Sequence, residues 1–336
     1  MAKRANYSVS INGKDISSTL APILTATTVS LRAGDEGDTA TLTLDDTGGK
    51  IAMPAIGARI QISLGWSGQA RRVIFDGTVD ETISTCTRSG GRTLSVSAKG
   101  FDAGGNAKAK KRRHWDNATI QTIVSDAARA AGITSARVDP DLAAIVLKYW
   151  AMDDESLLHM GRRLAARIGG DFQVQGDVAQ MARRGASYSP TVTATYGDNL
   201  HAWNLAPLLG RKIYAKVVAP FFNRTTGQWD KVEVDTGLGG SAVLTISPPA
   251  DDRDDARRQA RARATDSKRA AGGGQVQIEG TTDAVPDGAC VVSGAPPGID
   301  QSYRILGVTH ALDRSGGWVT KLELGNPDQA SETTTS

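Results

Sequence analysis

The stretch that organises the chain is Tyr149–Met181, YWAMDDESLLHMGRRLAARIGGDFQVQGDVAQM. Apolar residues recur in it at steps of three and four, which is the spacing of one face of an α-helix. These residues are Leu157, Met160, Gly161, Leu164, Ala165 and Ile168. Asp153 is expected to cap the helix, and Gly169-Gly170 to end it with a left-handed residue. The sequence therefore predicts a helix that leads into a short hairpin, with its turn at Gly176-Asp177.

Length and composition limit the classes of protein to consider. The 336 residues suffice for two or three domains, and 37 glycines with only 5% aromatic residues favour many short strands and turns. The net charge of +3 is too small to indicate a dedicated nucleic-acid or membrane binder. No apolar run approaches the ~18 residues of a membrane span, and the first residues lack the apolar core of a signal peptide. We expect a protein that is made and folded in a cytoplasm.

The two cysteines, Cys86 and Cys290, lie in strand-like runs far apart in the sequence. Their number excludes a disulfide framework, and buried free thiols are the favoured interpretation. Whether either thiol pairs within an assembly is left open by the sequence.

Residues 1–100 contain strand patterns at intervals of ~10 residues with no helical pattern between them. The clearest is Gly57–Trp66, in which apolar and polar residues alternate. Arg88-Ser89-Gly90-Gly91 then joins two further strands. The pattern favours a small antiparallel barrel or sandwich, and we expect a first β-barrel over residues 1–103.

A second helix is expected to begin at Asp116 and to end at Gly132, with an apolar stripe that starts at Ile120. Trp115 and Ile120 stand on either side of Asp116 at the spacing of a hydrophobic staple. Together with the hairpin described first, this helix predicts a mixed α/β domain over residues 104–198.

A basic cluster, Lys108–Arg113, precedes this helix. A solvated linker and a contact with an anion both explain it. The linker is favoured, because one cluster without interleaved aromatic residues is a weak signal for nucleic acid.

Strand patterns resume from Thr191 to the end of the chain. Residues 251–271 interrupt them with a highly charged helical pattern that has a narrow alanine face, which permits close approach to a sheet. The expected parts are the second β-barrel in two segments (199–235 and 274–326), a helical insertion that packs with the α/β domain (236–273), and a disordered tail (327–336).

The two β-rich ends resemble each other. Three pairs of segments match. Pro54 with Gly57–Gly65 resembles Pro286 with Gly288–Gly294, and the turn Arg88–Gly91 resembles the turn Arg314–Gly317. After these turns, Leu94 and Val96 correspond roughly to Leu322 and Leu324. Turn chemistry restricts hairpin loops to such residues, so chance agreement is an alternative. We expect a duplication, and hence an α+β fold with two similar small antiparallel β-barrels and an inserted mixed α/β domain.

Four motifs, taken in order, resemble the phage late control protein D family. Its members are baseplate hub proteins of contractile tails, related to the hub part of type VI secretion VgrG proteins. The motifs are Pro54–Gly100 with GARIQISLGW and FDGTVD, the helix Trp115–Gly132, the run Asp154–Phe172, and Tyr303–Leu312 with Gly316-Gly317. The resemblance covers roughly residues 5–326.

The resemblance implies a homotrimer in which two barrels per chain form a pseudo-six-fold ring around a channel. Such a ring joins a hexameric tail tube, or a tube-initiator protein, to a trimeric central spike. VgrG proteins continue into a spike whereas this chain stops, so a separate trimeric spike protein is expected. Further implied partners are the tape measure and wedge proteins, in a virion tail baseplate assembled in the host bacterial cytoplasm. A phage tail, a tailocin and another contractile injection machine are not distinguished.

The residues that could carry chemistry do not form a catalytic pattern. The histidines occur singly, without the spacing of a zinc site: His114, His159, His201 and His310. His310 lies in an alternating strand, which favours a structural histidine. No nucleophile elbow, phosphate-binding loop or dinucleotide fingerprint is present. We therefore expect no enzyme, and no catalytic, cofactor-binding or metal-binding residues.

Two acidic clusters have a structural explanation. Asp153-Asp154-Glu155 could suggest metal or acid chemistry, but helix capping is favoured, and Glu155 could instead anchor the helix to a neighbouring strand. The second cluster fits the start of a helix: Asp251, Asp252, Asp254 and Asp255.

The alternative function is a small-barrel module that binds single-stranded nucleic acid through stacked aromatic residues and a basic groove. The few aromatic residues do not gather on one face of any strand pattern. Tight, salt-sensitive oligonucleotide binding would favour this alternative over the hub.

Overall fold

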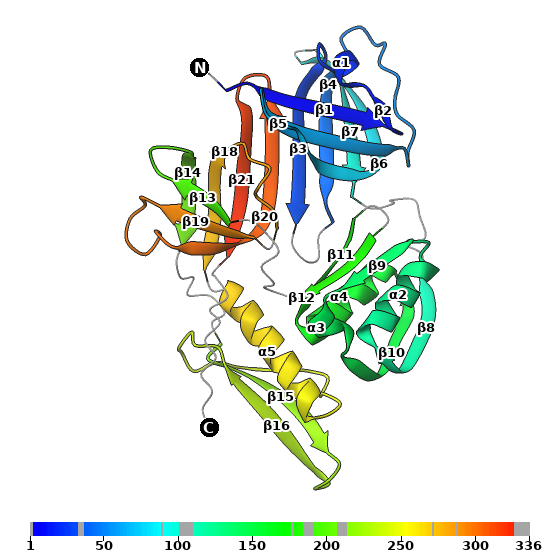
Figure 1. Cartoon of the computed structure of the whole chain (residues 1–336), viewed down its shortest axis with the longest axis vertical. Coiled ribbons are helices and arrows are strands. Elements are labelled where there is room, and N and C mark those ends of the chain that lie inside the picture. The colour runs from blue at the N-terminus through cyan, green and yellow to red at the C-terminus, as the bar shows by residue number, and fades with distance from the viewer. Residues whose placement is uncertain are drawn as a thin grey trace.

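In the described part of the chain, thirteen strands form one large, mostly antiparallel sheet, which lies at the top of the molecule in Figure 1. The structure is a computed structural model, and it describes residues 3–32, 37–88, 90–100, 110–175, 178–183, 191–206, 214–270, 272–286 and 288–325. The strands of the large sheet are β1 (Ala5–Ile11), β2 (Lys14–Asp15), β3 (Leu24–Arg32), β4 (Thr39–Asp45), β5 (Arg59–Trp66), β6 (Arg72–Thr87), β7 (Gly91–Lys99), β13 (Thr191–Thr195), β14 (Leu200–Ala206), β18 (Gly273–Glu279), β19 (Ala289–Ser293), β20 (Ser302–Asp313) and β21 (Gly317–Gly325). A short helix, α1 (Ser17–Leu20), lies between β2 and β3.

The strand order is the same in the two halves of this sheet. In the first half the order is β1-β5-β6-β7-β4-β3, and in the second it is β13-β19-β20-β21-β18-β14. Taken in chain order, each strand of the first half except the two-residue β2 has its counterpart at the same place in the second. Corresponding pairs are antiparallel in both halves, except that β1 is antiparallel to β5 whereas β13 is parallel to β19. This pairing supports the duplication predicted from the sequence.

The register repeats as well as the order. The hairpins β6–β7 and β20–β21 turn at Gly91 and Gly317, whose φ angles of +70° and +71° lie in the left-handed region that glycine favours. Both hairpins carry a β-bulge at the same distance from the turn. Counting from these turns, Leu94 corresponds to Thr320 and not, as the sequence suggested, to Leu322.

The predicted match between β5 and β19 is wrong by one residue. The carbonyl oxygens of Ala58 and Gly288 accept equivalent backbone hydrogen bonds, each 2.9 Å long, from the neighbouring strand. Ala58 therefore corresponds to Gly288, and Ile60 to Cys290, and both of these side chains are 0% exposed. A shift of one residue exchanges the two faces of a strand, so only this alignment keeps buried residues on the core side.

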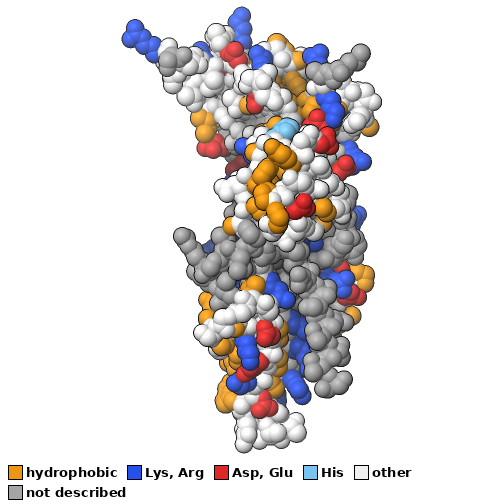
Figure 2. Space-filling model, turned by 90° about the vertical axis from the view of Figure 1, so that its left-hand side faces the viewer, with side chains coloured by type: hydrophobic (Ala, Val, Ile, Leu, Met, Phe, Trp, Pro, Cys, Tyr) orange, Lys and Arg blue, Asp and Glu red, His pale blue; other side chains and the backbone are white. Residues whose placement is uncertain are grey.

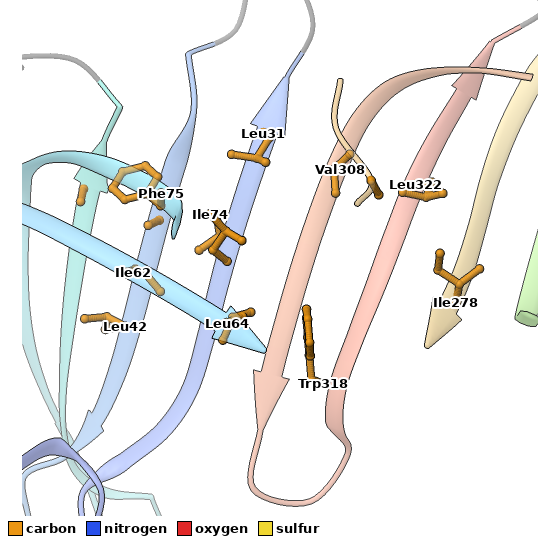
Figure 3. Close-up of a cluster of buried hydrophobic side chains, with 14 of the residues drawn as sticks. Leu31, Leu42, Ile62, Leu64, Ile74, Phe75, Ile278, Val308, Trp318 and Leu322 are labelled. Carbon is orange, nitrogen blue, oxygen red and sulfur yellow. The ribbon is translucent and has the colours of Figure 1, made fainter. Parts of the chain in front are cut away.

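One hydrophobic core serves both halves of the sheet (Figure 3). The first half contributes Leu31, Leu42, Ile62, Leu64, Ile74 and Phe75, and the second contributes Ile278, Val308, Trp318 and Leu322. Trp66 joins the halves, because its ring lies 5.0 Å from that of Trp318 and its Nε1 donates a hydrogen bond of 2.9 Å to the carbonyl oxygen of Gly280. Each large apolar side chain buried in this way stabilises the fold by about 1.5–3 kcal/mol.

The second unit is the mixed α/β part expected in the middle of the chain, below the large sheet in Figure 1. Its elements are β8 (Lys111–Thr119), α2 (Ile120–Ala130), β9 (Ser135–Val138), α3 (Pro140–Ala143), β10 (Val146–Glu155), α4 (Leu157–Ile168), β11 (Gly170–Gln175) and β12 (Val178–Arg183). β8 pairs with β10, and β12 lies between β9 and β11. The six residues of the predicted apolar face of α4 are all buried, so this helix is confirmed.

The capping predictions for both helices are wrong. Residues Asp153 to Glu155 continue strand β10, and the cap of α4 is Ser156, whose Oγ accepts from the amide of His159 at 3.2 Å. Likewise Thr119, not Asp116, caps α2. Serine, threonine and aspartate all serve as caps, so composition alone does not choose among neighbours. The predicted end of α4 is confirmed, because Gly169 has φ of +75°.

A third unit lies at the bottom of Figure 1. It consists of β15 (Lys216–Asn223), β16 (Gln228–Asp235), β17 (Val243–Thr245) and the long helix α5 (Arg253–Ala270). The three strands form a sheet of their own, and Ala256, Ala260 and Ala264 of α5 are buried in its core. Small side chains let the helix approach this sheet closely, as the narrow alanine face predicted.

Strand pairing corrects two of the expected segment assignments. Residues 216–235 are expected in the second barrel, but β15 pairs with β16 and β17 in a separate sheet, apart from the large one. β13 falls within the expected α/β domain, but it pairs with β19 in the large sheet. The expected β-rich α+β class is confirmed, and the domain boundaries as a whole stay a prediction. The expected turn at 176–177, the first residues of the basic cluster (108–109) and the tail 327–336 lie outside the described residues.

Candidate interaction surfaces

His310 is a structural histidine by its surroundings. It is 1% exposed in β20, and its Nδ1 lies 3.2 Å from Oγ1 of Thr320. That hydroxyl donates to the carbonyl oxygen of Thr281, so it accepts the proton on Nδ1. Burial lowers the pKa of His310 to about 4, which keeps the ring neutral at pH 7. The other histidines are exposed and lie on three different elements: His114 on β8, His159 on α4 and His201 on β14.

Glu155 anchors helix α4 to strand β10, which is the alternative considered for it. It is 9% exposed at the end of β10, pairs with Arg163 of α4, and lies 2.5 Å from Nδ1 of His159. The Arg163 guanidinium also stacks 4.0 Å from the ring of Trp150. These contacts hold helix α4 against strand β10.

The second acidic cluster starts α5, as predicted. Asp252 Oδ1 accepts a hydrogen bond of 3.0 Å from the amide of Asp255. This bond and a second one from Lys148 lower the pKa of Asp252. Asp255 is 2% exposed and pairs with Arg167 of α4 at 2.9 Å. These ion pairs fasten α5 to the α/β unit. Within the part of the chain that the structure describes, no group of three or more His, Cys, Asp or Glu side chains is arranged to hold a metal ion.

The described part of the basic cluster is a strand and not a linker. Lys111 to Arg113 pair with β10, and Lys111 Nζ donates to the carbonyl oxygen of Ala130. Arg112 lies 3.4 Å from carboxylate oxygens of Asp153 and Asp154. Acidic neighbours therefore offset much of the positive charge on which an anion contact would depend.

The cysteines differ in their surroundings. Cys290 is buried, as expected, and burial raises the pKa of its thiol to about 12. Cys86 is exposed near the end of β6, so the expectation of a buried thiol is wrong there.

A groove of about 920 Å³ lies beside the free end of the β15–β16 hairpin. Phe222 and Trp229 line it, with 42% and 65% of their surfaces exposed, and their ring centroids are 5.5 Å apart. Lys148 and Asp252 line it from the other side, 2.9 Å apart. An exposed aromatic pair in a groove is typical of a protein contact surface. This pair was not predicted from the sequence, although Phe221, Phe222 and Trp229 flank Asn223–Gly227, a run of residues typical of a turn.

Among the described residues, β6 and β14 each have an unpaired edge, as do β1–β2 and β13 at the outer ends of the two halves. β14 is the last strand of the second half and, among the described residues, pairs only with β18 apart from a bridge between Tyr196 and Leu200. In the first half, β5 covers β6 only as far as Thr78, so Glu81–Thr87 pair with β7 alone in the described structure. Unpaired strand edges are templates for pairing with another chain.

No helix among the described residues is both long enough and apolar enough to cross a membrane.

Comparison with known proteins agrees with this geometry. The probable baseplate hub protein of Escherichia phage 186 is 28% identical over 198 residues, which cover 57% of this chain and 50% of that protein. The chain is similar to baseplate hub proteins. The probable baseplate hub protein of Escherichia phage P2 is 26% identical over 204 residues, 58% of this chain and 52% of that protein. The chain thus spans about half the length of the curated relatives it matches. No family model matches it.

Solved structures share the fold over nearly the whole chain. A tail protein of prophage MuSo2 from Shewanella oneidensis has a TM-score of 0.74 at 15% identity, with 96% of this chain and 99% of that chain covered. A tail protein from Neisseria meningitidis has a TM-score of 0.71 at 17% identity, covering 96% and 97%. A type VI secretion component from E. coli has a TM-score of 0.62 at 14% identity, covering 96% and 77%. At these identities the likeness concerns the fold alone. The predicted resemblance to hub and VgrG-related proteins is confirmed at that level.

Proposed function

We propose that this chain is a structural baseplate hub of a contractile phage tail. Three copies form a ring in which each half of the large sheet, as one small barrel, occupies one of six similar positions. The ring seats on a hexameric tail tube, or on a tube-initiator protein, and surrounds the channel. Its true threefold symmetry matches a separate trimeric central spike.

The observation that carries the proposal is the repeated strand order of the two halves. A ring of three identical chains presents six like surfaces only if each chain contains the same structure twice. The repeat here extends to the hairpin turns and to the positions of the β-bulges, so the two halves offer closely similar backbones. The similarity of the chain to two probable baseplate hub proteins supports the same function.

The arrangement of the units indicates which face of the ring meets which partner. The α/β unit and the α5 unit occur once in each chain, and both lie below the large sheet in Figure 1. In a trimer they form a face with threefold symmetry only. We therefore assign that face, with the groove at the β15–β16 hairpin, to the spike, and the opposite, duplicated face to the tube. Tape measure and wedge proteins are further proposed neighbours, in a virion tail assembled in the bacterial cytoplasm.

The role we propose is structural and not enzymatic. The single-stranded nucleic-acid module gains no specific support from the geometry. Among the described residues, the exposed pair Phe222 with Trp229 lies on the small sheet, whereas exposed Tyr196 contacts the partly buried Trp203 of β14 in the large sheet, so they form no common stacking surface.

The test is the mass of the purified protein in solution, alone and with a trimeric spike protein, by sedimentation equilibrium. The proposal predicts a particle of three chains, each of 35.3 kDa, whose formation the spike favours. A stable dimer under both conditions would contradict it.

A further inference from the structure

The two halves of the sheet meet through one strand pair inside the chain. Gly307–Asp313 of β20 pair antiparallel with Ala26–Arg32 of β3. Val29 and His310 stand opposite each other in this pair and are 0% and 1% exposed. The contact is therefore a fully packed junction between one half and the other.

The counterparts of these two strands both carry an open edge of the sheet. β6 corresponds to β20, and β14 corresponds to β3. β3 and β14 also share a bulge in the same place, between Leu24 and Ala26 in one and between Leu200 and Ala202 in the other, so β14 keeps the backbone course of β3. In Figure 1 β14 lies at the left of the molecule and β6 at its right. One chain cannot join its own two edges when they face away from each other.

We propose that β6 of one chain pairs antiparallel with β14 of a second copy, in the register of β20 with β3. This inference rests on the proposed ring and names the contact that closes it. Transferring the register of the internal junction places Ile83 opposite Ala206, Thr85 opposite Asn204 and Thr87 opposite Ala202 of the second copy.

The side chains at these edges suit a contact between copies. Ile83 is 47% exposed on β6, whereas its counterpart Thr309 takes part in the internal junction, where its hydroxyl lies 3.3 Å from that of Ser30. The new contact replaces this hydroxyl pair by an apolar pair, Ile83 with Ala206. Figure 2 shows the face at the left of Figure 1, and a strip of hydrophobic side chains crosses its upper half, on the side where β14 lies.

The rest of the β6 edge is polar, which keeps a free chain from indiscriminate pairing. Its residues include Ser84, Thr85 and Thr87, all exposed. Hydroxyl side chains leave the backbone groups able to pair while they lower the apolar surface of the edge. Main-chain hydrogen bonds then supply the affinity, and the apolar pair fixes the register.

The number of edges determines the form of the assembly. Each chain has one edge of each kind, so the contact is head to tail, and it closes into a ring or continues as a filament. Inside the chain the same type of contact relates one half to the next. Three chains then give six like junctions, three within chains and three between them, which is the pseudo-six-fold ring of the proposed function.

A disulfide between opposed positions tests the register. We would make Thr85→Cys with Asn204→Cys in a Cys86→Ser background, and Thr28→Cys with Ala311→Cys in the same background as a matched control. The control pair occupies the corresponding positions of the internal junction. Opposed residues on antiparallel strands have Cα atoms about 4.5–5.5 Å apart, within the range that a disulfide spans. The proteins would be oxidised in air with a copper catalyst at high concentration and run without reductant, and trimer formation would be followed separately by sedimentation.

The expected result is covalent dimers and trimers, and no larger species, for the 85/204 pair, with a fast internal disulfide for the control. A ladder that continues past three chains supports the β6–β14 contact and overturns the trimeric ring. A trimer by sedimentation that forms no 85/204 disulfide, while the control closes, overturns this contact and leaves the hub proposal intact. Monomers that form only the control disulfide overturn the contact as well. A third pair, Thr85→Cys with Lys231→Cys, must stay uncrosslinked, because Lys231 lies on the separate small sheet.

Discussion

Replacing His310 by glutamine should change how the stability of the protein depends on pH. His310 titrates at about 4 in the folded chain because burial disfavours its charged form, against ~6.5 in an unfolded one. Between these values the unfolded chain binds a proton that the folded chain does not. The free energy of unfolding therefore falls as the pH falls from about 6.5 to 4, and the contribution of the neutral ring is fully present above that window.

Asp38 acts in the opposite direction in the same window. Burial raises the pKa of Asp38 to about 6, from ~3.9 in an unfolded chain. Here the folded chain holds the extra proton, so its stability rises as the pH falls from about 6 to 4. One pKa unit corresponds to ~1.4 kcal/mol, so each group changes the free energy of unfolding by on the order of 3 kcal/mol across this window. The two changes have opposite signs and nearly cancel in the native protein.

The assay is urea unfolding of the native protein and of His310→Gln at pH 7.5 and pH 4.5. Glutamine has its own cost in the buried site, but that cost does not depend on pH. Relative to the native protein, the variant should gain about 2.5 kcal/mol of stability between pH 7.5 and 4.5. Asp38→Asn should shift the balance the other way. If the difference between His310→Gln and the native protein stays constant over this range, the reasoning about the buried ring is refuted.

Three further predictions concern packing and reactivity. Gly161→Ala should cost about 1–3 kcal/mol in urea unfolding, because the added methyl group would overlap the ring of Phe172, and an unchanged midpoint would contradict this. Arg167→Ala should cost about 3–5 kcal/mol, because it leaves the buried Asp255 carboxylate without its partner on α4. An exposed arginine of α5 changed to alanine is the control, with an effect within about 0.5 kcal/mol. At pH 8 a thiol reagent should modify the native chain once, since Cys290 is buried with a pKa raised to about 12, and a second thiol should react only after unfolding.

The sequence predicted local structure better than strand partners. The apolar face of α4 and its glycine end follow from side-chain spacing and from the freedom of Gly169, which are local properties. The sheet to which residues 216–235 belong does not follow from local properties. Alternation of apolar and polar residues shows that a strand has two different faces, but it does not show which strand lies beside it. Charged residues and turn residues therefore could not show that this hairpin packs against α5, apart from the large sheet.

The repeat was visible in the sequence, but its register was not. Turn glycines fixed the hairpin match at Gly91 and Gly317, since both need a left-handed backbone. For β5 and β19, a match on the pair Gly57-Ala58 with Gly288-Ala289 placed the strands one residue out of register. Only hydrogen bonds to the next strand correct it. The open edges, which carry the proposed contact between copies, appear only once the whole strand order is known.

The central claim is that six like halves from three chains make one ring. Averaged end-on images of the assembled hub by electron cryomicroscopy test it most directly. A ring of this kind should show six similar densities around a central channel on one face, and three larger units related by threefold symmetry on the other. Three equal densities on both faces, or a particle with a twofold axis only, would contradict it.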